Sequence, residues 1–321
     1  MIVRALAPAK LNLYLEVVGK RPDGYHELAT LFQTVDWGDD VEVERTATRG
    51  VTCTVEGAHD LPADERNLAV RAATAWLAAT GAGGGVRLLL RKRIPLGGGL
   101  GGGSSDAASV LRALERLGRR ERNGETMEGA GAGAPPRALV PEEVLSMAEA
   151  LGADVPFLLT GGTATATGRG DVIRAIPGQP SLLEVVLVMP PFGTETGKVF
   201  ARCAERLRRA PADGLARACA ALSSGEPAAI RAAHHNDLAE AAMRAYPELL
   251  RFTSRCERAL GRAPCLTGSG STLFDVPDPG ETADVVARLR DLPGRREVVR
   301  MGKVASPLAS WDSEPLPPPP P

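Results

Sequence analysis

The sequence predicts an α+β fold divided into two domains. Its 321 residues are 44% hydrophobic and 24% charged, a composition typical of a globular protein that can bury a sizeable core. Strand-like alternation and helix-like spacing of apolar residues follow one another in both halves of the chain. A nearly all-apolar segment, 182–189, begins the second series, so we expect an N-terminal domain over 1–170 and a C-terminal domain over 171–305. One large domain is the alternative.

The first part of the chain is predicted to contain strands and then a helix. Apolar residues alternate with others over 9–18, and polar residues alternate with branched ones over 40–44 and 51–56, as expected for strands. Over 67–80 the apolar positions return at helical spacing, and a strand-like run over 86–92 follows.

A glycine-rich stretch, 97–105, reads Gly-Gly-Gly-Leu-Gly-Gly-Gly-Ser-Ser. It separates the strand 86–92 from a predicted helix that begins at Ser105 and ends near Gly118. Glycine is unfavourable where its freedom is not needed, so its density indicates a ligand that approaches the backbone closely. A strand, loop and helix N-terminus in this order direct amide groups and the positive helix end at one spot, which suits a polyphosphate. A flexible surface loop is the alternative.

The segment after this helix has a different composition. Residues 119–137 contain an alternating Gly-Ala run and a Pro-Pro pair but almost no large apolar residue, which predicts a disordered insertion. A helix over 141–151 follows, then a strand over 155–159 and a run rich in glycine and threonine over 161–170.

The second predicted domain mixes helices and short strands. Its elements are, in order, a strand over 182–189, helices within 198–260, a strand, glycine turn and strand over 264–274, a helix over 281–292 and a strand over 297–300. The proline-rich tail, 306–321, is not expected to join a core.

Charge and cysteine usage narrow the class of protein. Lys and Arg number 38 against 39 Asp and Glu, so no overall field attracts nucleic acid or an anionic membrane. The five scattered cysteines predict reduced thiols, and the apolar runs are too short for a signal peptide or a membrane span. The neighbouring His234 and His235 do not share a helix face, which disfavours a metal pair. We expect a cytoplasmic monomer or homodimer that binds a small molecule and neither nucleic acid nor membrane.

Three familiar ligand-binding loops fit the glycine stretch poorly. Gly97, Gly99 and Gly102 satisfy G-x-G-x-x-G, but the acidic residue expected about 20 positions later would fall in the Gly/Ala insertion, which disfavours a nicotinamide dehydrogenase. A Walker A loop needs Gly-Lys followed by Ser or Thr, which this stretch lacks. The protein-kinase patterns His-Arg-Asp and Asp-Phe-Gly are also absent from the sequence.

The segment 95–108, Pro-Leu-Gly-Gly-Gly-Leu-Gly-Gly-Gly-Ser-Ser-Asp-Ala-Ala, resembles the phosphate loop of the GHMP kinases, the superfamily of galactokinase, homoserine kinase and mevalonate kinase. The extra Gly102-Gly103 and the following Asp106 resemble the variant found in the erythritol-derivative kinases of that superfamily. Four further segments resemble the family's motifs in the family's order: 8–13, 21–28, 151–157 and 266–271.

The resemblance implies a fold, an activity and cofactors. The fold would be the two-domain GHMP kinase fold, with an N-terminal ribosomal S5 domain 2-like part, a C-terminal ferredoxin-like part and the active site in the cleft between them. The activity would be transfer of the γ-phosphoryl group of ATP, with Mg²⁺, to the 2-hydroxyl of a cytidine diphosphate-linked methylerythritol in the non-mevalonate isoprenoid precursor pathway. The alternatives are another GHMP small-molecule kinase, for homoserine or mevalonate, and a nucleotide-binding protein without catalysis.

Catalytic and ATP-binding residues also follow from the resemblance. Asp154 would accept the proton of the acceptor hydroxyl, with Lys10 as its partner; from the residues alone, these two form a structural ion pair. The implied ATP-binding residues are Asn67, Lys92, Pro95, Gly97, Gly98, Gly99, Leu100, Gly101, Gly102, Gly103, Ser104 and Ser105. Without the resemblance, either serine is equally an N-cap, Asn67 a helix cap and Lys92 a solvated strand charge. No protein ligand of Mg²⁺ is assigned.

The acceptor is expected to contact aromatic and amide groups. By resemblance, Tyr25 and His26 bind the cytosine and Phe200 covers its other face, although a phenylalanine at a helix start is often a core residue. The complete implied set is Asn12, Tyr25, His26, Asp154, Thr196, Phe200, Gly268, Ser269 and Gly270, with Thr194 as the alternative to Thr196. The turn 268–270 would also support the phosphate loop; a plain hairpin turn is the alternative.

Overall fold

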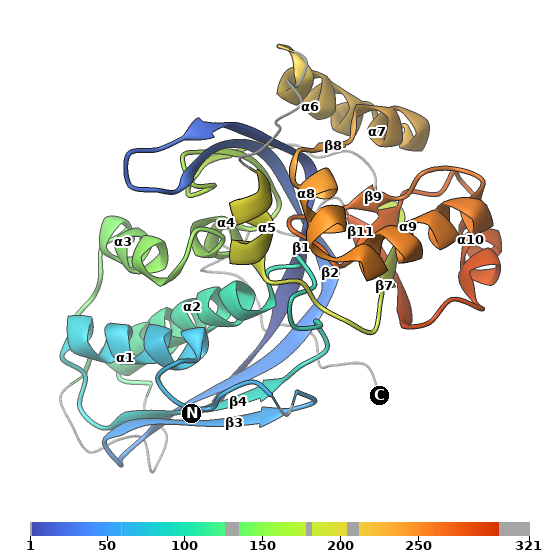
Figure 1. Cartoon of the computed structure of the whole chain (residues 1–321). Helices are drawn as coiled ribbons and strands as arrows, with labels where there is room; N and C mark the ends of the chain where they lie inside the picture. The colour runs from blue at the N-terminus through green and yellow to red at the C-terminus, as the bar shows by residue number, and fades with distance from the viewer. Residues whose placement is uncertain (1, 59, 126–134, 178–181, 204–211, 302–321) are drawn as a thin grey trace.

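The computed structural model of the chain describes residues 2–58, 60–125, 135–177, 182–203 and 212–301. They form the predicted α+β fold, in which helices lie against a large, mainly antiparallel sheet (Figure 1). Within these ranges, no helix combines the length and apolar character needed to cross a bilayer. The proline-rich tail lies outside the described residues.

Two long strands form the centre of the sheet. The strands are β1 (Ile2–Lys20), β2 (His26–Thr46), β3 (Gly50–Glu56), β4 (Gly85–Arg91), β5 (Thr163–Thr167), β6 (Val172–Ala175), β7 (Leu183–Met189), β8 (His235–Asn236), β9 (Cys265–Leu266), β10 (Leu273–Asp275) and β11 (Arg295–Met301). β2 pairs antiparallel with β1, β4 and β5, while β7 pairs antiparallel with β10 and β11. The register of β1 and β2 sets Lys10 opposite Thr34 and Asn12 opposite Phe32. Lys10 and Asn12 are two residues apart and therefore share one face of β1.

Helices cover the sheet in groups. They are α1 (Leu68–Thr80), α2 (Gly102–Arg122), α3 (Pro141–Leu151), α4 (Val155–Thr160), α5 (Thr196–Cys203), α6 (Gly214–Ser224), α7 (Pro227–Ala233), α8 (Leu238–Ala245), α9 (Pro247–Leu260) and α10 (Thr282–Leu289). Helices α1 to α4 pack on β1 to β5 around a core that includes Trp76 and Leu114, whereas α5, α8, α9 and α10 pack beside β7 around Leu249 and Val285 (Figure 1).

Three contacts join the parts of the chain assigned to separate domains. The end of β11 pairs with β2 at Met301 and Val35, and β8 pairs parallel with β1. A shared core cluster unites Leu11 of β1 with Leu187 of β7 and Phe274 of β10. The division near residue 170 stays a prediction, and these contacts indicate that the two parts depend on each other.

One element was predicted with the wrong type. Residues 155–160 form the short helix α4 and not a strand. All side chains from Val155 to Leu159 are buried, and a short run without a polar face cannot be assigned by periodicity. The local signal was Pro156, which lies in the first turn, where a missing N–H does not matter.

Two other expectations needed new boundaries. β2 extends far beyond the predicted 40–44, because residues 30–35 are buried on both faces and show no alternation. Helix α2 starts earlier and ends later than expected. The two ends of the predicted insertion are structured, since Arg122 is helical and Arg137 donates its backbone amide to the Thr80 carbonyl. The prediction for residues 126–134 lies outside the described ranges.

Candidate active site

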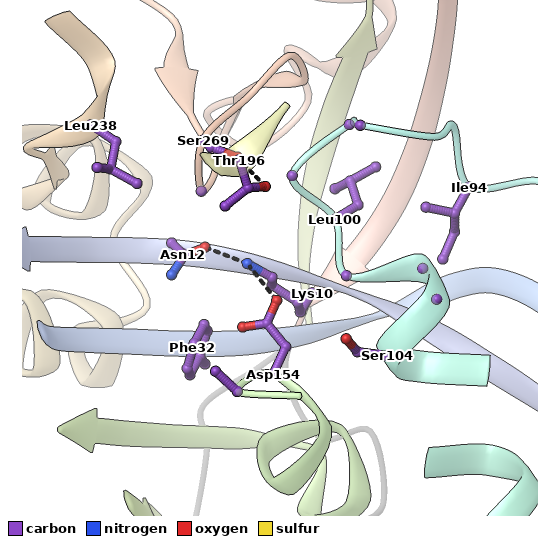
Figure 2. Close-up of a pocket in the computed structure, with 18 of the residues that line it drawn as sticks. Lys10, Asn12, Phe32, Ile94, Leu100, Ser104, Asp154, Thr196, Leu238 and Ser269 are labelled. Carbon is purple, nitrogen blue, oxygen red and sulfur yellow. Dashed lines mark hydrogen bonds and ion pairs between the residues drawn. The ribbon is translucent and has the colours of Figure 1, made fainter. Parts of the chain in front are cut away.

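A cavity of about 410 Å³ opens where β1, β2, the glycine loop and the turn before α4 meet (Figure 2). The predicted residues that line it are Lys10, Asn12, Lys92, Pro95, Gly97, Gly98, Gly99, Leu100, Gly101, Gly102, Gly103, Ser104, Asp154, Thr196, Phe200, Gly268 and Ser269. Five predicted residues are not among its lining: Asn67, Ser105, Tyr25, His26 and Gly270.

The glycine loop is held against the second glycine turn by backbone contacts. The amides of Ser271 and Thr272 donate to the Gly97 and Gly98 carbonyls at 3.0 and 3.2 Å. Gly99 has φ +73°, and a Cβ there would lie 2.3 Å from the Thr267 carbonyl oxygen. Only glycine fits this close approach. The turn between β9 and β10 is thus both a hairpin turn and a support for the loop.

The N-terminus of α2 lines the cavity with backbone amides that have no acceptor within the helix. Gly101 is the N-cap, with φ +73° and no side-chain cap, and the first helical bond runs from Ser105 N–H to Gly101 at 2.8 Å. The amides of Gly102, Gly103 and Ser104 therefore have no intrahelical acceptor, and all three residues line the cavity. The serine N-cap interpretation was wrong: Ser105 is fully buried, and its hydroxyl donates to the Pro8 carbonyl at 2.7 Å.

Lys10 and Asp154 come together in the cavity beside the N-cap of α2, where a Cβ at Gly101 would lie 3.1 Å from Lys10 Cγ. The Lys10 ammonium lies 3.6 Å from Asp154 Oδ2 and donates to Asn12 Oδ1 at 2.7 Å (Figure 2). The Lys10 side chain is 5% exposed and that of Asp154 is 33% exposed, so the carboxylate is the member of the pair that solvent and ligands reach. Asp154 is the N-cap residue of α4 but makes no side-chain cap hydrogen bond. Its oxygens are therefore not required to hold the helix.

A hydrogen-bond chain fixes the orientation of Asn12. Its Nδ2 donates to Thr30 Oγ1 at 2.9 Å, and Thr30 in turn donates to the Tyr14 carbonyl at 2.6 Å. The backbone N–H of Asn12 donates to Thr267 Oγ1 at 3.0 Å. With Nδ2 engaged, Asn12 Oδ1 must point toward Lys10, which lies over the Phe32 ring at 5.3 Å. The ammonium is thus held in one place.

Thr194, before α5, and Thr196, at its start, have different environments. Thr196 lines the cavity and shares a hydrogen bond of 3.0 Å with the Ser269 hydroxyl (Figure 2). Thr194 is buried, and its hydroxyl bonds with the carbonyls of Gly97 and Ser269. Thr194 therefore ties the two glycine segments together, and Thr196 is the one available to a ligand.

The aromatic residues predicted to bind cytosine lie beside the cavity. Phe200 lines it, and the His26 ring lies 5.1 Å from the Phe200 ring at a tilt of 31°. Burial and the nearby Lys20 charge lower the pKa of His26, which favours the neutral imidazole. Among the described residues, His26 Nε2 is buried without a hydrogen-bond partner. Tyr25 is 58% exposed, with Arg169 stacked over its ring at 5.2 Å.

Two predicted nucleotide-binding side chains are engaged elsewhere. Asn67 caps α1: its Oδ1 accepts from the Ala69 amide at 2.9 Å and its Nδ2 donates to the Pro62 carbonyl. Lys92 is not a solvated strand charge, because it is buried and its ammonium contacts both Asp39 and Asp106. Lys92 still lines the cavity, so an ATP contact through this residue stays a prediction.

Sequence reasoning missed Arg169, a cationic residue of the cavity lining. It lies between β5 and β6 in the sequence Gly168-Arg169-Gly170. A lone cation between two glycines in the glycine- and threonine-rich run was the available signal, because such glycines mark a tight turn that presents the side chain between them.

Comparisons with known proteins identify the class of the fold. A profile of the GHMP kinases N terminal domain matches residues 67–162, which include the glycine loop. A crystal structure of homoserine kinase from Cytophaga hutchinsonii superposes with a TM-score of 0.66 at 19% identity, covering 94% of this chain and 95% of that chain. The fold is therefore that of the GHMP kinases, a class that uses ATP.

Nearer relatives narrow the class. The 4-diphosphocytidyl-2-C-methyl-D-erythritol kinases of Pelotomaculum thermopropionicum and Salinispora tropica are 39% and 38% identical to this chain, over 90% and 94% of its length and 94% and 91% of theirs. A crystal structure of 4-(cytidine 5′-diphospho)-2C-methyl-D-erythritol kinase has a TM-score of 0.72 at 36% identity, covering 94% of this chain and 99% of that chain. The chain belongs to the 4-diphosphocytidyl-2-C-methyl-D-erythritol kinase family of the GHMP kinases.

Proposed function

We propose that this protein transfers the γ-phosphoryl group of ATP to the 2-hydroxyl of 4-diphosphocytidyl-2-C-methyl-D-erythritol, in the cytoplasm and in the non-mevalonate pathway. The observation that carries the proposal is the arrangement of the cavity, whose lining combines a carboxylate and an ammonium with three helix amides that have no intrahelical acceptor. The names of the relatives, 38–39% identical over most of this chain, support the choice of acceptor.

The donor side fits a polyphosphate. The amides of Gly102, Gly103 and Ser104 bind phosphate oxygens, and the N-terminal end of the 21-residue helix α2 favours their negative charge. A Cβ at Gly103 would meet only the Leu68 Cδ1 atom, at 3.8 Å, so the backbone there has open space before it. When bound, ATP supplies the phosphoryl group.

On the acceptor side, Asp154 accepts the proton of the 2-hydroxyl at a carboxylate oxygen. The hydroxyl oxygen then forms its bond to the γ-phosphorus while the bond to the ADP oxygen breaks. Lys10 stabilises the negative charge that develops on the transferring group, and Asn12 keeps the ammonium in position through its 2.7 Å hydrogen bond.

Mg²⁺ accompanies ATP in this proposal. In the described parts of the chain, no group of three or more His, Cys, Asp or Glu side chains is placed to hold a metal ion. Because the Ser105 hydroxyl is engaged by Pro8, Ser104 is the serine that can assist the ion or the phosphates.

A substrate panel tests the proposal. We would measure ADP release with 4-diphosphocytidyl-2-C-methyl-D-erythritol, homoserine and mevalonate in a coupled assay. We expect kcat/KM for the cytidine-linked acceptor to exceed the other two by at least about 100-fold, because polar groups built for one acceptor are left unpaired by another. A preference for homoserine or mevalonate, or ATP binding without turnover of any acceptor, would contradict it.

A further inference from the structure

Arg169 occupies a turn that is fixed to the start of β2, beside the residues predicted to bind cytosine. Gly168 and Gly170, on either side of it, have φ +70° and +94°. The Gly168 amide donates to Glu27 Oε1 at 2.9 Å, and the Leu28 amide donates back to the Gly168 carbonyl at 2.8 Å. The Arg169 backbone is thus tied to the start of β2, directly after Tyr25 and His26.

One edge of the Arg169 guanidinium contacts the Asp171 carboxylate, and another edge has a free N–H donor among the described residues. Nε and Nη2 lie 2.9 and 2.8 Å from Asp171 Oδ2, and the Arg169 amide donates to Asp171 Oδ1 at 3.0 Å. The hydrogen bond with Asp171 raises the pKa of Arg169, so the side chain stays cationic. Among the described residues, Nη1 has no hydrogen-bond partner, and the side chain is 31% exposed.

The other cationic side chains of the cavity lining are already engaged. Lys10 contacts Asn12 and Asp154, and Lys92 contacts two buried carboxylates. Lys10 keeps an N–H for the transferring phosphoryl group, and Arg169 adds a further lining cation, whose Nη1 has no partner among the described residues. It also lies over the Tyr25 ring at 5.2 Å, on the acceptor side of the cavity.

We propose that Arg169 is a specificity-determining residue that binds the diphosphate linker of the acceptor, with Nη1–H donating to a phosphoryl oxygen. The inference rests on the proposed function, in which the acceptor carries a diphosphate between its base and its sugar alcohol. A guanidinium suits this task because it is always charged and presents donors in a fixed plane. The Asp171 contact fixes that plane, so little side-chain freedom is lost when the acceptor binds.

Binding of cytidine diphosphate and of cytidine tests the inference, because the two ligands share the base and ribose and differ in the diphosphate. Both would be titrated calorimetrically into the full chain saturated with a non-hydrolysable ATP analogue, so that the donor site is filled. For Arg169→Met we expect the Kd of cytidine diphosphate to rise about 10- to 100-fold, as for a lost charge-assisted hydrogen bond. The Kd of cytidine should stay within about twofold.

Arg174→Met is the matched control. It removes the same charge five residues further on, at an exposed position of β6 outside the cavity lining, and should change neither Kd. Arg169→Lys keeps the charge but loses the planar fork, so it should weaken cytidine diphosphate binding by an intermediate factor. If Arg169→Met fails to fold, Arg169→Lys still tests whether Arg169 binds the diphosphate.

Two results would overturn the inference. One is an unchanged Kd for cytidine diphosphate in both Arg169 variants. The other is an equal rise for cytidine diphosphate and cytidine, which would mean that Arg169 acts only by holding the Tyr25 ring. Failure of the proposed function would look different, because the parent protein itself would then bind neither ligand and would not phosphorylate the cytidine-linked acceptor.

Discussion

Lys92, Asp39 and Asp106 form a buried charge cluster beneath the start of α2. The Lys92 ammonium contacts both carboxylates, and the amide of Ile94 donates to Asp39 Oδ1 at 2.8 Å. Burial opposes the charge of Lys92, but the two carboxylates outweigh it and raise its pKa. Burial also raises the pKa of Asp106 to about 7, against the opposing charge of Lys92. Two carboxylates share one cation here, and burial favours the protonated form of Asp106.

This cluster predicts a pH dependence of stability. The unfolded pKa of an aspartate is about 3.9, below that of Asp106 in the folded protein. The contribution of Asp106 to the free energy of unfolding is therefore fully present below pH ~4 and is lost as the pH rises toward 7. We expect the parent to lose at least about 1 kcal/mol relative to Asp106→Asn between pH 4.5 and pH 7.5, measured by urea unfolding.

Asp291→Asn serves as the control for that comparison. The Asp291 side chain is 89% exposed, so its replacement should leave the pH dependence of the parent unchanged. A constant difference in unfolding free energy between the parent and Asp106→Asn across this range would show that Asp106 is ionised throughout, contrary to the prediction.

At the residue scale, sequence could suggest partners only where a motif supplied them. Lys10 and Asp154 were predicted as a pair and lie 3.6 Å apart. The prediction that Lys92 is solvated was wrong. Its partner Asp39 is 53 positions away in the sequence, and nothing in the strand pattern indicates that the two residues meet. Arg169 was missed for a similar reason, since only the folded hairpin carries it to the cavity.

At the element scale, the prediction succeeded for a helix with a clear cap and for an apolar, valine-rich run of strand length. The helix predicted over 67–80 is α1, capped by Asn67, and the strand predicted over 182–189 is β7. It failed for α4 and for most of β2, where neighbouring side chains are buried on every side and the apolar pattern carries no period. Tertiary burial, which is not visible locally, decides such segments.

The glycine loop gives a prediction at this scale. Gly99→Ala would place a Cβ 2.3 Å from the Thr267 carbonyl oxygen, at a φ of +73° that side chains rarely adopt. We expect the free energy of unfolding to fall by about 3 kcal/mol, from steric overlap and backbone strain together, and ATP to bind more weakly. Thermal unfolding and ATP titration measure the two effects.

Gly103→Ala is the matched control for stability, because its Cβ would meet only Leu68 Cδ1, at 3.8 Å, within a helix. It should keep the parental Tm or raise it slightly, since alanine favours helix formation. Equal Tm values for Gly99→Ala and the parent would refute the proposed close packing of the two glycine segments.

At the scale of the whole molecule, the two predicted domains share one buried core, and both contribute residues to the cavity. Leu31 and Val35 of β2 belong to the same buried cluster as Val185 of β7 and Val299 of β11. The cavity also takes lining from both parts, with Lys10 from the first and Ser269 from the second. Catalysis in this arrangement requires both parts to be folded at once.

A fragment of residues 1–170 should therefore not fold alone. It would expose the inner face of β1 and β2 and lose the pairings with β8 and β11. We expect poorly dispersed amide NMR signals from the fragment, and a single cooperative transition for the full chain. A fragment with dispersed signals and cooperative melting would support two independent domains instead.

The most direct test of the account is the rate of phosphoryl transfer to 4-diphosphocytidyl-2-C-methyl-D-erythritol by the parent and by Asp154→Asn in a single turnover. Asparagine keeps the size of the side chain but cannot accept the proton. We predict a rate that is lower by about 10²- to 10⁴-fold, with ATP binding and Tm close to those of the parent. A variant that transfers the phosphoryl group at nearly the parental rate would contradict the assignment of Asp154 as the base.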